Sequence, residues 1–227
     1  MKQKFACGEA IFNSADSPIA LCLLAHGAGA GMQSEFLQTL AAELQTHAIF
    51  VVRFEFPYMQ KTTVDGKRRP PDRADRLVAH WQTVVTEITQ HSELQQLPCF
   101  LAGKSMGGRM AVMAVNLIDQ AVAAIGLGYP FYGRGKNQQP RIEPLQGLEK
   151  PALIIQGNRD PMGNAQQVAK LPCFSKVQLE WLDDGDHDFK PRKASGFTQA
   201  QHIATAANLT SCFIRQQLET ENKLRNT

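Results

Sequence analysis

The stretch LAGKSMGGRM, residues 101–110, decides how the rest of the chain is interpreted. It joins an apolar run, Pro98–Ala102, to a helical pattern that starts at Met106. Its middle, Gly103-Lys104-Ser105-Met106-Gly107, matches the G-x-S-x-G turn, which holds a serine between a strand and a helix. The two glycines leave room where neighbouring backbone would otherwise meet a side chain. We therefore predict that Ser105 is a nucleophile at the N-terminus of a helix.

A phosphate-binding loop is the competing interpretation, since Gly103-Lys104-Ser105 could also end a G-x-x-x-x-G-K-S motif. That motif needs its first glycine at position 98, which is Pro98. The residues between, Cys99–Ala102, are typical of a strand and cannot form an open cradle of backbone N–H groups around a phosphate. The serine turn is the better match.

Strand and helix patterns alternate along the chain. Apolar runs predict strands at 19–24, 48–57, 98–103, 123–128, 151–157 and 177–182. Helical spacing predicts helices at 34–45, 72–90, 105–117, 164–171 and 198–218, with Asp72 as a cap and 58–71 as a polar loop. This alternation predicts one α/β domain over residues 1–227, with a mostly parallel sheet and helices on both faces. The first 18 residues could add antiparallel edge strands.

Composition narrows the class of protein. With 227 residues, 43% hydrophobic and 20% charged, the chain is typical of a globular protein, and its net charge of +3 is too small to indicate nucleic-acid binding. Five cysteines without a CxxC pair do not suggest a disulfide framework. We find no signal-peptide pattern, no apolar segment of the ~18 residues that a membrane span needs, and no metal-ligand spacing. We therefore expect a cytoplasmic protein with no membrane partner, no metal and no cofactor.

A serine nucleophile needs a base and an acid that orients the base. Asp160, in QGNRDPMG, follows one predicted strand, and His187, in DDGDHDF, follows the last one. The order serine, acid, histidine and their common place at the carboxyl edge of the sheet favour these two residues. The other histidines precede the serine or fall in helices. Four acids near the histidine are rivals whose expected role is surface charge: Asp183, Asp184, Asp186 and Asp188.

An oxyanion hole would complete the site. One donor is expected to be the N–H of Met106, and the second should come from the turn HGAGAGM, residues 26–32. Ala28 is the preferred second donor and Gly29 the alternative. The same turn partly matches a dinucleotide-binding G-x-G-x-x-G motif, with Glu55 at a distance suited to a ribose. That interpretation lacks its third glycine and leaves the serine, acid and histidine unexplained.

Together, LLAHGAGAGM (23–32), AGKSMGGRMA (102–111), IIQGNRDPMG (154–163) and DDGDHDFK (183–190) resemble the α/β-hydrolase superfamily. More narrowly, they resemble a branch of small predicted hydrolases related to dienelactone-hydrolase-like proteins. The resemblance implies an eight-stranded sheet and a triad of Ser105, Asp160 and His187. True dienelactone hydrolases have a cysteine nucleophile, whereas position 105 is a serine. The short stretch 129–150 predicts little or no cap domain.

These features predict an esterase-like serine hydrolase that acts on a small carboxylic ester, thioester or lactone through an acyl-enzyme. A non-catalytic binding or scaffold protein of the same fold is the alternative. The basic segment 58–76 is either a solvated loop or a wall that attracts an acidic group of the substrate through Arg68, Arg69 or Arg73. Arg109 is expected to be a structural partner of nearby carbonyls or carboxylates. The sequence predicts no particular oligomeric state.

Overall fold

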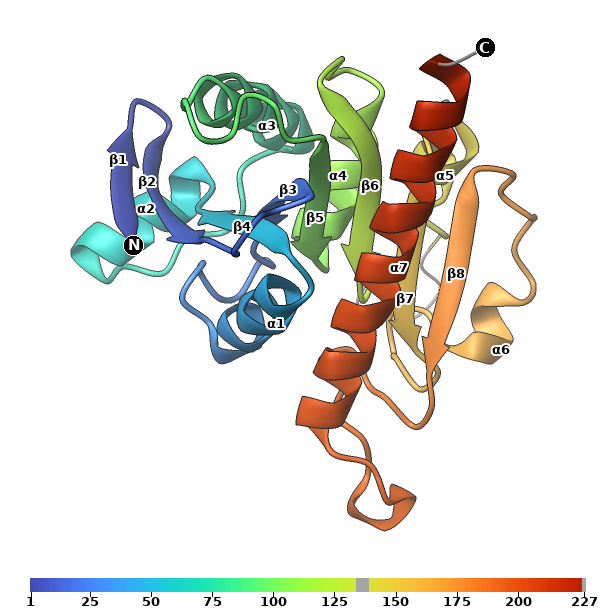
Figure 1. Cartoon of the computed structure of the whole chain (residues 1–227). Coiled ribbons are helices and arrows are strands. Elements are labelled where there is room, and N and C mark those ends of the chain that lie inside the picture. Colours follow the sequence, from blue (N-terminus) through green and yellow to red (C-terminus); the bar gives the residue numbers. More distant parts are fainter. Residues whose placement is uncertain (134–138, 226–227) are drawn as a thin grey trace.

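Eight strands form one sheet in the order β1-β2-β4-β3-β5-β6-β7-β8 (Figure 1). The structure, a computed structural model, describes residues 1–133 and 139–225. The six strands from β4 to β8 pair in parallel, and β1 and β2 add an antiparallel hairpin at one edge. This confirms the predicted sheet. The strands are β1 (Lys2–Phe5), β2 (Gly8–Asn13), β3 (Ala20–Ala25), β4 (Ile49–Phe54), β5 (Cys99–Lys104), β6 (Ala121–Leu127), β7 (Ala152–Gly157) and β8 (Val177–Leu182).

The central strands are apolar on both sides because both faces of the sheet are covered. Successive side chains of a strand point to opposite faces. In β3, Leu21 and Leu23 therefore pack into one buried cluster, whereas Cys22 and Leu24 pack into another. Every residue of β3, β4, β5 and β7 is buried, which explains why these strands are mostly apolar, with Arg53, Lys104 and Gln156 as buried polar exceptions.

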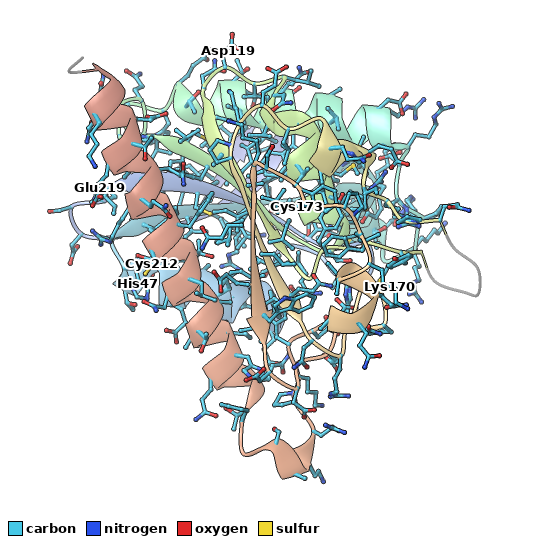
Figure 2. All side chains as sticks on the ribbon, turned by 90° about the vertical axis from the view of Figure 1, so that its right-hand side faces the viewer. His47, Asp119, Lys170, Cys173, Cys212 and Glu219 are labelled. Atoms are coloured by element: carbon cyan, nitrogen blue, oxygen red, sulfur yellow. The ribbon has the colours of Figure 1, made fainter. Side chains whose placement is uncertain are left out.

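Helices form a layer on each face. One buried cluster joins the sheet to α3 and α4, and the other joins it to α1 and α7. Seen from the side of β8, Figure 2 shows α7, which carries Cys212 and Glu219, running along one face of the sheet. The helices are α1 (Glu35–Thr46), α2 (Pro57–Asp65), α3 (Ala74–Thr89), α4 (Met106–Val115), α5 (Glu143–Gln146), α6 (Ala165–Val168) and α7 (Gln199–Arg225), with a 3₁₀ turn η1 (Lys193–Ser195).

The main difference from the predicted elements is α2, which falls in the segment expected to be a polar loop. Pro57 is its first residue, where a fixed φ and a missing N–H are tolerated, and Gly66 ends it with a φ of 71°. The next helix begins after Arg73, so the predicted cap at Asp72 is wrong. The last helix is longer than expected and extends to Arg225.

The carboxyl ends of β3, β5, β7 and β8 meet at the same edge of the sheet, since these strands run in parallel. The segments that follow them are therefore brought together from distant parts of the chain. The segment between β6 and β7 includes the stretch 129–150, which was predicted to form little or no cap domain. Residues 134–138 of this stretch lie outside the described residues. In the described remainder of that connection the one helix is α5, with four residues, so few of the described residues of this connection can cover the edge.

Candidate active site

Ser105 occupies the sharp turn between β5 and α4. Its backbone has φ 52° and ψ −114°, a strained conformation that costs on the order of 1–3 kcal/mol in a residue with a side chain. The flanking glycines allow it: a Cβ on Gly103 would collide with the backbone of Gly107, and one on Gly107 would lie 2.5 Å from the carbonyl oxygen of His26. The N–H of Ser105 donates to the carbonyl of Leu127 at 2.8 Å, which fixes the turn against β6.

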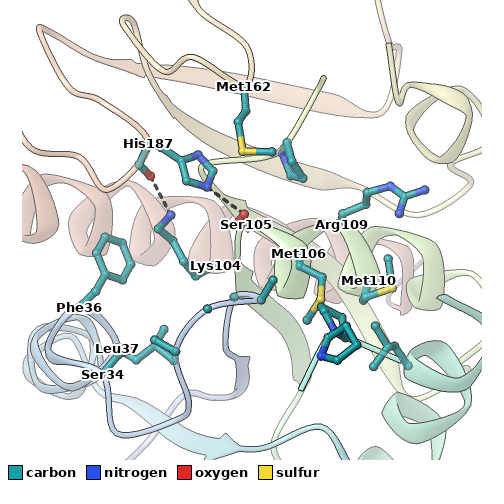
Figure 3. A pocket seen from close by; sticks show the side chains of 18 of the residues that line it. Ser34, Phe36, Leu37, Lys104, Ser105, Met106, Arg109, Met110, Met162 and His187 are labelled. Carbon is teal, nitrogen blue, oxygen red and sulfur yellow. Dashed lines mark hydrogen bonds between the residues drawn. The ribbon is translucent and has the colours of Figure 1, made fainter. Parts of the chain in front are cut away.

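Three predicted site residues are joined by hydrogen bonds. The Oγ of Ser105 lies 2.9 Å from Nε2 of His187, and Nδ1 of His187 lies 2.8 Å from Oδ2 of Asp160 (Figure 3 draws the first contact). A carboxylate only accepts hydrogen bonds, so the neutral imidazole carries its proton on Nδ1 and accepts the serine hydroxyl at Nε2. The serine, the base and the acid come from three separate connections at the carboxyl edge of the sheet.

Asp160 is fully buried and its carboxylate is held by further donors. The N–H of Met162 donates to Oδ1 at 2.7 Å, and the side-chain amide of Gln156 donates to Oδ2 at 2.8 Å. The amide nitrogen of Gln156 also lies 3.2 Å from the carbonyls of Tyr129 and Gly163. The sequence analysis did not single out Gln156, although an amide inside the apolar run LIIQG was a signal that it has a polar partner.

The rival acids have other contacts. The carboxylate of Asp184 pairs with the guanidinium of Arg159 at 2.7 Å and with that of Arg192 at 2.6 Å. Asp186 accepts two backbone N–H groups of its own loop, at 2.8 and 2.9 Å. These acids shape the loop that carries the imidazole, whereas Asp160 is the carboxylate that contacts the ring.

His26, at the start of the glycine-rich turn, is buried and held in one tautomer. The backbone N–H of Phe56 donates to its Nε2 at 3.0 Å, so Nε2 carries no proton. The proton on Nδ1 is donated to the carbonyl of Gly27 at 2.7 Å. Burial lowers the pKa of His26 to about 4, which keeps the ring neutral.

Tyr58, from α2, approaches the other side of the same turn. Its hydroxyl lies 3.4 Å from the carbonyl oxygen of Gly27 and 3.3 Å from that of Ala28. All peptide bonds described are trans, so each N–H points opposite to the carbonyl of the preceding residue. The N–H groups of Ala28 and Gly29 are therefore directed away from Tyr58. Together with Met106, the first residue of α4, both residues line the cavity into which the serine opens.

The far end of the turn is also anchored, by the segment after β4. The N–H of Met32 lies 3.3 Å from the carboxylate of Glu55, and the guanidinium of Arg53 donates to the carbonyl of Met32 at 2.8 Å. The second carboxylate oxygen of Glu55 accepts from Thr63 at 2.9 Å. Because Glu55 is buried and hydrogen-bonded in this way, it is not available to a ribose, which argues against the dinucleotide interpretation.

A cavity of about 970 Å³ surrounds Ser105 and His187. Apolar side chains form much of its lining, among them Phe36, Leu37, Leu77, Met106, Met110 and Met162. Of the three arginines predicted to contact substrate, Arg68 and Arg69 line the cavity. Arg69 is also held by both carboxylate oxygens of Asp65, at 2.7 and 2.6 Å. Arg73 is not in the lining: its side chain is 85% exposed and lies 3.5 Å from Asp75.

The sequence of the chain matches a known family over most of its length. The model for the family described as alpha/beta hydrolase domain matches residues 18–215. The chain belongs to the alpha/beta hydrolase family. The resemblance stated from the motifs is thereby confirmed.

Solved structures share the fold of this alpha/beta hydrolase at low sequence identity. A dienelactone hydrolase from Anabaena variabilis has a TM-score of 0.71 and 16% identity, covering 95% of this chain and 97% of its own. An alpha-beta serine hydrolase homologue from Coxiella burnetii has a TM-score of 0.66 and 18% identity, covering 92% and 93%. The esterase domain of a Rhodothermus marinus protein has a TM-score of 0.64 and 15% identity, covering 95% and 97%.

Lys104, the residue before Ser105, has a structural role in this hydrolase that the sequence analysis missed. Its Nζ donates to the backbone carbonyl of His187 at 2.7 Å, lies 3.1 Å from the carboxylate of Asp188, and sits 5.4 Å from the centre of the Phe36 ring (Figure 3). Burial lowers the pKa of Lys104, and the charge of Asp188 opposes this shift. A lysine at the end of a fully apolar strand was the signal for a buried ion pair.

Residues 1–133 and 139–225 contain no group of three or more His, Cys, Asp and Glu side chains arranged to hold a metal ion. Over the same part of the chain, no helix combines the length and apolar character that a membrane crossing requires.

Proposed function

We propose that this chain is a serine hydrolase of the esterase type, acting on a carboxylic ester, thioester or lactone of a small molecule. The observation that carries the proposal is the series of hydrogen bonds from Ser105 through His187 to Asp160, at 2.9 and 2.8 Å. A serine hydroxyl is activated when it lies within hydrogen-bond reach of a base and a third group holds that base in place.

In the first half of the reaction, Oγ of Ser105 attacks the carbonyl carbon while its proton passes to Nε2 of His187. Asp160 holds the imidazole in place and stabilises its positive charge. The tetrahedral intermediate then collapses, the bond to the leaving group breaks, and the imidazolium gives its proton to the departing oxygen or sulfur. An acyl group remains on the serine.

In the second half, water takes the place of the alcohol or thiol. His187 removes a proton from water as it attacks the acyl carbon, and the serine oxygen leaves with that proton. In both halves the carbonyl oxygen becomes negative, and the N–H groups of Met106 and Ala28 stabilise it, with Gly29 as the alternative to Ala28. In comparable enzymes, losing one such donor costs roughly 10²–10³ in kcat.

Covalent labelling tests the proposal. A fluorophosphonate probe should label the parent protein but not Ser105→Ala. The matched control is Ser34→Ala, because Ser34 lines the same cavity and has no role in the proposed chemistry. Labelling that persists in Ser105→Ala would refute the assignment of the nucleophile. A parent protein that is never labelled would favour the alternative, a non-catalytic binding or scaffold protein.

A substrate screen would then separate the three bond types. Aryl esters of increasing acyl length, acyl thioesters and lactones should be compared by kcat/KM. The small number of described residues over the active edge supports small or extended substrates that need no cap to enclose them.

We also propose that the protein works in the cytoplasm. The support is its cysteines, all five of which are unpaired: Cys7, Cys22, Cys99, Cys173 and Cys212. Alkylation of the native protein in freshly broken cells, without reductant, should modify the exposed thiols. Quantitative disulfides at these positions would contradict this placement.

A further inference from the structure

The wall of the cavity carries more positive than negative charge. Two carboxylates line it, those of Asp72 and Asp188. Five cationic side chains also line it: Arg68, Arg69, Lys104, Arg109 and Arg141. Arg69 and Lys104 have carboxylate partners. In the described part of the chain, no carboxylate lies within ion-pair distance of Arg68, Arg109 or Arg141. Among the described residues, the lining of the cavity therefore contains three arginines that form no ion pair with a carboxylate.

Arg109 is the cation closest to the proposed nucleophile along α4. It lies four residues after Ser105, which is the N-cap of this helix, and both residues line the cavity. In Figure 3, Ser105 lies between His187 on one side and Arg109 on the other. The Nε of Arg109 is inaccessible to solvent and has no hydrogen-bond partner among the described residues. A buried N–H without an acceptor is costly. Arg109 lines the cavity, so a ligand carboxylate there can supply acceptors to the other N–H groups of its guanidinium.

Arg141 is fixed beside Arg109 through Tyr129. The backbone N–H of Arg141 donates to the carbonyl of Phe131 at 2.6 Å, and its carbonyl accepts the hydroxyl of Tyr129 at 3.0 Å. Burial raises the pKa of Tyr129, and the charge of Glu143 adds to this rise. The charges of Arg109 and Arg141, and a side-chain hydrogen bond from Arg109, act against it. Both guanidinium groups therefore lie near the same hydroxyl, although they come from different segments of the chain.

The carboxylates of the cavity lie elsewhere. Asp188 contacts Lys104 on the side of His187. Burial raises the pKa of Tyr58, and the charge of Asp72 adds to this rise. Burial lowers the pKa of His80, and the charge of Asp72 opposes that shift. The charge of Asp72 is therefore felt near Tyr58 and His80, on the side of the glycine-rich turn.

The charge of Glu143 is felt at Tyr129 as well. Glu143 does not line the cavity, and it lies within ion-pair distance of neither Arg109 nor Arg141.

We propose that Arg109 and Arg141 form a carboxylate subsite, and that the substrates of this hydrolase are esters or thioesters that carry a free carboxylate within a few bonds of the scissile carbonyl. The subsite rests on the proposed function for its place beside the reacting carbonyl. Guanidinium groups suit it because their planar N–H donors match the two oxygens of a carboxylate. One turn of α4 separates Arg109 from the nucleophile, a rise of about 6 Å, which sets the short spacing between the two groups of the substrate.

Matched ester pairs test this inference. The p-nitrophenyl half-esters of succinate, glutarate and adipate should be compared with neutral p-nitrophenyl esters of the same chain length. We expect the parent to favour at least one half-ester by about tenfold or more in kcat/KM. Arg109→Gln and Arg141→Gln should each reduce that ratio about tenfold, mainly through KM. Their kcat/KM for neutral esters should fall less than that for the half-esters, and thermal melting shows that both variants fold.

Two further variants sharpen the result. Arg73→Gln removes an arginine that lies outside the cavity and should keep the parent ratio. Arg109→Lys keeps the charge but not the planar pair of donors, and should restore part of the ratio. The inference is overturned if the parent shows no preference for any half-ester, or if Arg109→Gln and Arg141→Gln leave the preference intact.

The failure of the subsite and the failure of the proposed function are distinguishable. If neutral esters are cleaved and the probe labels Ser105, a missing preference for half-esters refutes the subsite alone. If no ester is cleaved and no label is found, the proposed function fails, and the subsite is tested by calorimetric binding of glutarate. Binding that is weakened about tenfold in Arg109→Gln supports the subsite, and glutarate that does not bind the parent overturns it.

Discussion

The ammonium group of Lys104 lies 2.7 Å from the backbone carbonyl oxygen of His187, which is 83 residues further along the chain. The contact joins the strand that ends at Ser105 to the loop that carries the imidazole. Lys104 is nearly buried, with 9% of its side chain exposed, so water does not compete strongly for this hydrogen bond. The position of the proposed base, His187, relative to the proposed nucleophile, Ser105, therefore depends on a side chain that need not touch the substrate carbonyl.

Replacing Lys104 should slow catalysis more than it weakens substrate binding. A charged hydrogen bond of this kind contributes roughly 1.5–3 kcal/mol, so we expect Lys104→Met to lower kcat by about 10–100-fold. Lys104→Arg keeps a cation and should recover part of the loss. The kcat of each variant is measured by steady-state kinetics with a neutral aryl ester. Thermal melting checks that the variants fold. A parent-like kcat in Lys104→Met would show that the loop holds its position without the lysine.

Removing the hydroxyl of Tyr58 should loosen the turn that offers the second oxyanion donor. The two contacts, at 3.3 and 3.4 Å, are long, so we expect Tyr58→Phe to lower kcat by about 3–10-fold with little change in KM. Tyr132→Phe is the control, because Tyr132 does not line the cavity. Equal kcat values for both variants would remove Tyr58 from the support of the oxyanion hole.

The assignment of the acid can be tested against its rivals. Asp160→Asn cannot accept the imidazole proton in the same way, and in comparable triads this change lowers kcat by about 10⁴. Asp183→Asn should keep nearly parent activity, since Asp183 contacts Asn158 at 3.3 Å rather than the imidazole. The measurement is kcat for a neutral ester in each variant. A larger loss in Asp183→Asn than in Asp160→Asn would move the role to the loop acids.

Stability should fall in mild acid because of His26. Its pKa is lowered by burial from 6.5 to about 4 in the folded chain. The unfolded chain regains the ordinary pKa and binds the proton first, so the free energy of unfolding decreases as pH falls from about 6.5 to about 4. At about 1.4 kcal/mol per pKa unit, the loss is on the order of 3 kcal/mol. Burial also lowers the pKa of His80, which adds to the effect in the same direction.

Urea denaturation at several pH values measures this dependence. His26→Gln lacks the titrating ring, so its free energy of unfolding should change less over the same pH range than that of the parent. The comparison concerns the change with pH, because the substitution also lowers stability at neutral pH. Parallel curves for parent and variant would show that His26 does not contribute.

The glycines of the nucleophile turn should differ sharply from the glycine of the oxyanion turn in their tolerance of a methyl group. A Cβ on Gly107 would lie 2.5 Å from the carbonyl oxygen of His26, whereas a Cβ on Gly29 would meet nothing within 4 Å. We expect Gly107→Ala to destabilise the fold by about 3 kcal/mol and Gly29→Ala by less than about 0.5 kcal/mol. Thermal melting of both variants checks this. Similar melting temperatures would mean that the turn relaxes around the added atom.

Local signals were enough to predict the strands and the three joined side chains. The strand at 177–182 was predicted with the observed bounds, since apolar residues alternate there between turn residues. Ser105 could be predicted because its turn has a strict glycine requirement. Asp160 and His187 follow strands that end at the same edge, so topology alone brings them near the serine.

Contacts between distant segments could not be predicted. Lys104 and Gln156 read as exceptions in apolar strands, and only the folded chain reveals that they contact His187 and Asp160. The helix α2 was missed because its sequence, PYMQKTTVD, buries only Tyr58 and Met59 and so lacks a clear apolar stripe. Its proline marks the end of a strand and the start of a helix equally well.

The crowded crossing at Gly103, Gly107 and Gly108 has a consequence for how such proteins diversify. A side chain at any of these three positions would collide with neighbouring backbone, so a larger residue does not fit there in a natural or an engineered variant. The cavity lining from 68 to 77 and at 141 comes from connections outside the sheet. New specificities are therefore most readily obtained by exchanging those connections while the serine turn is left untouched.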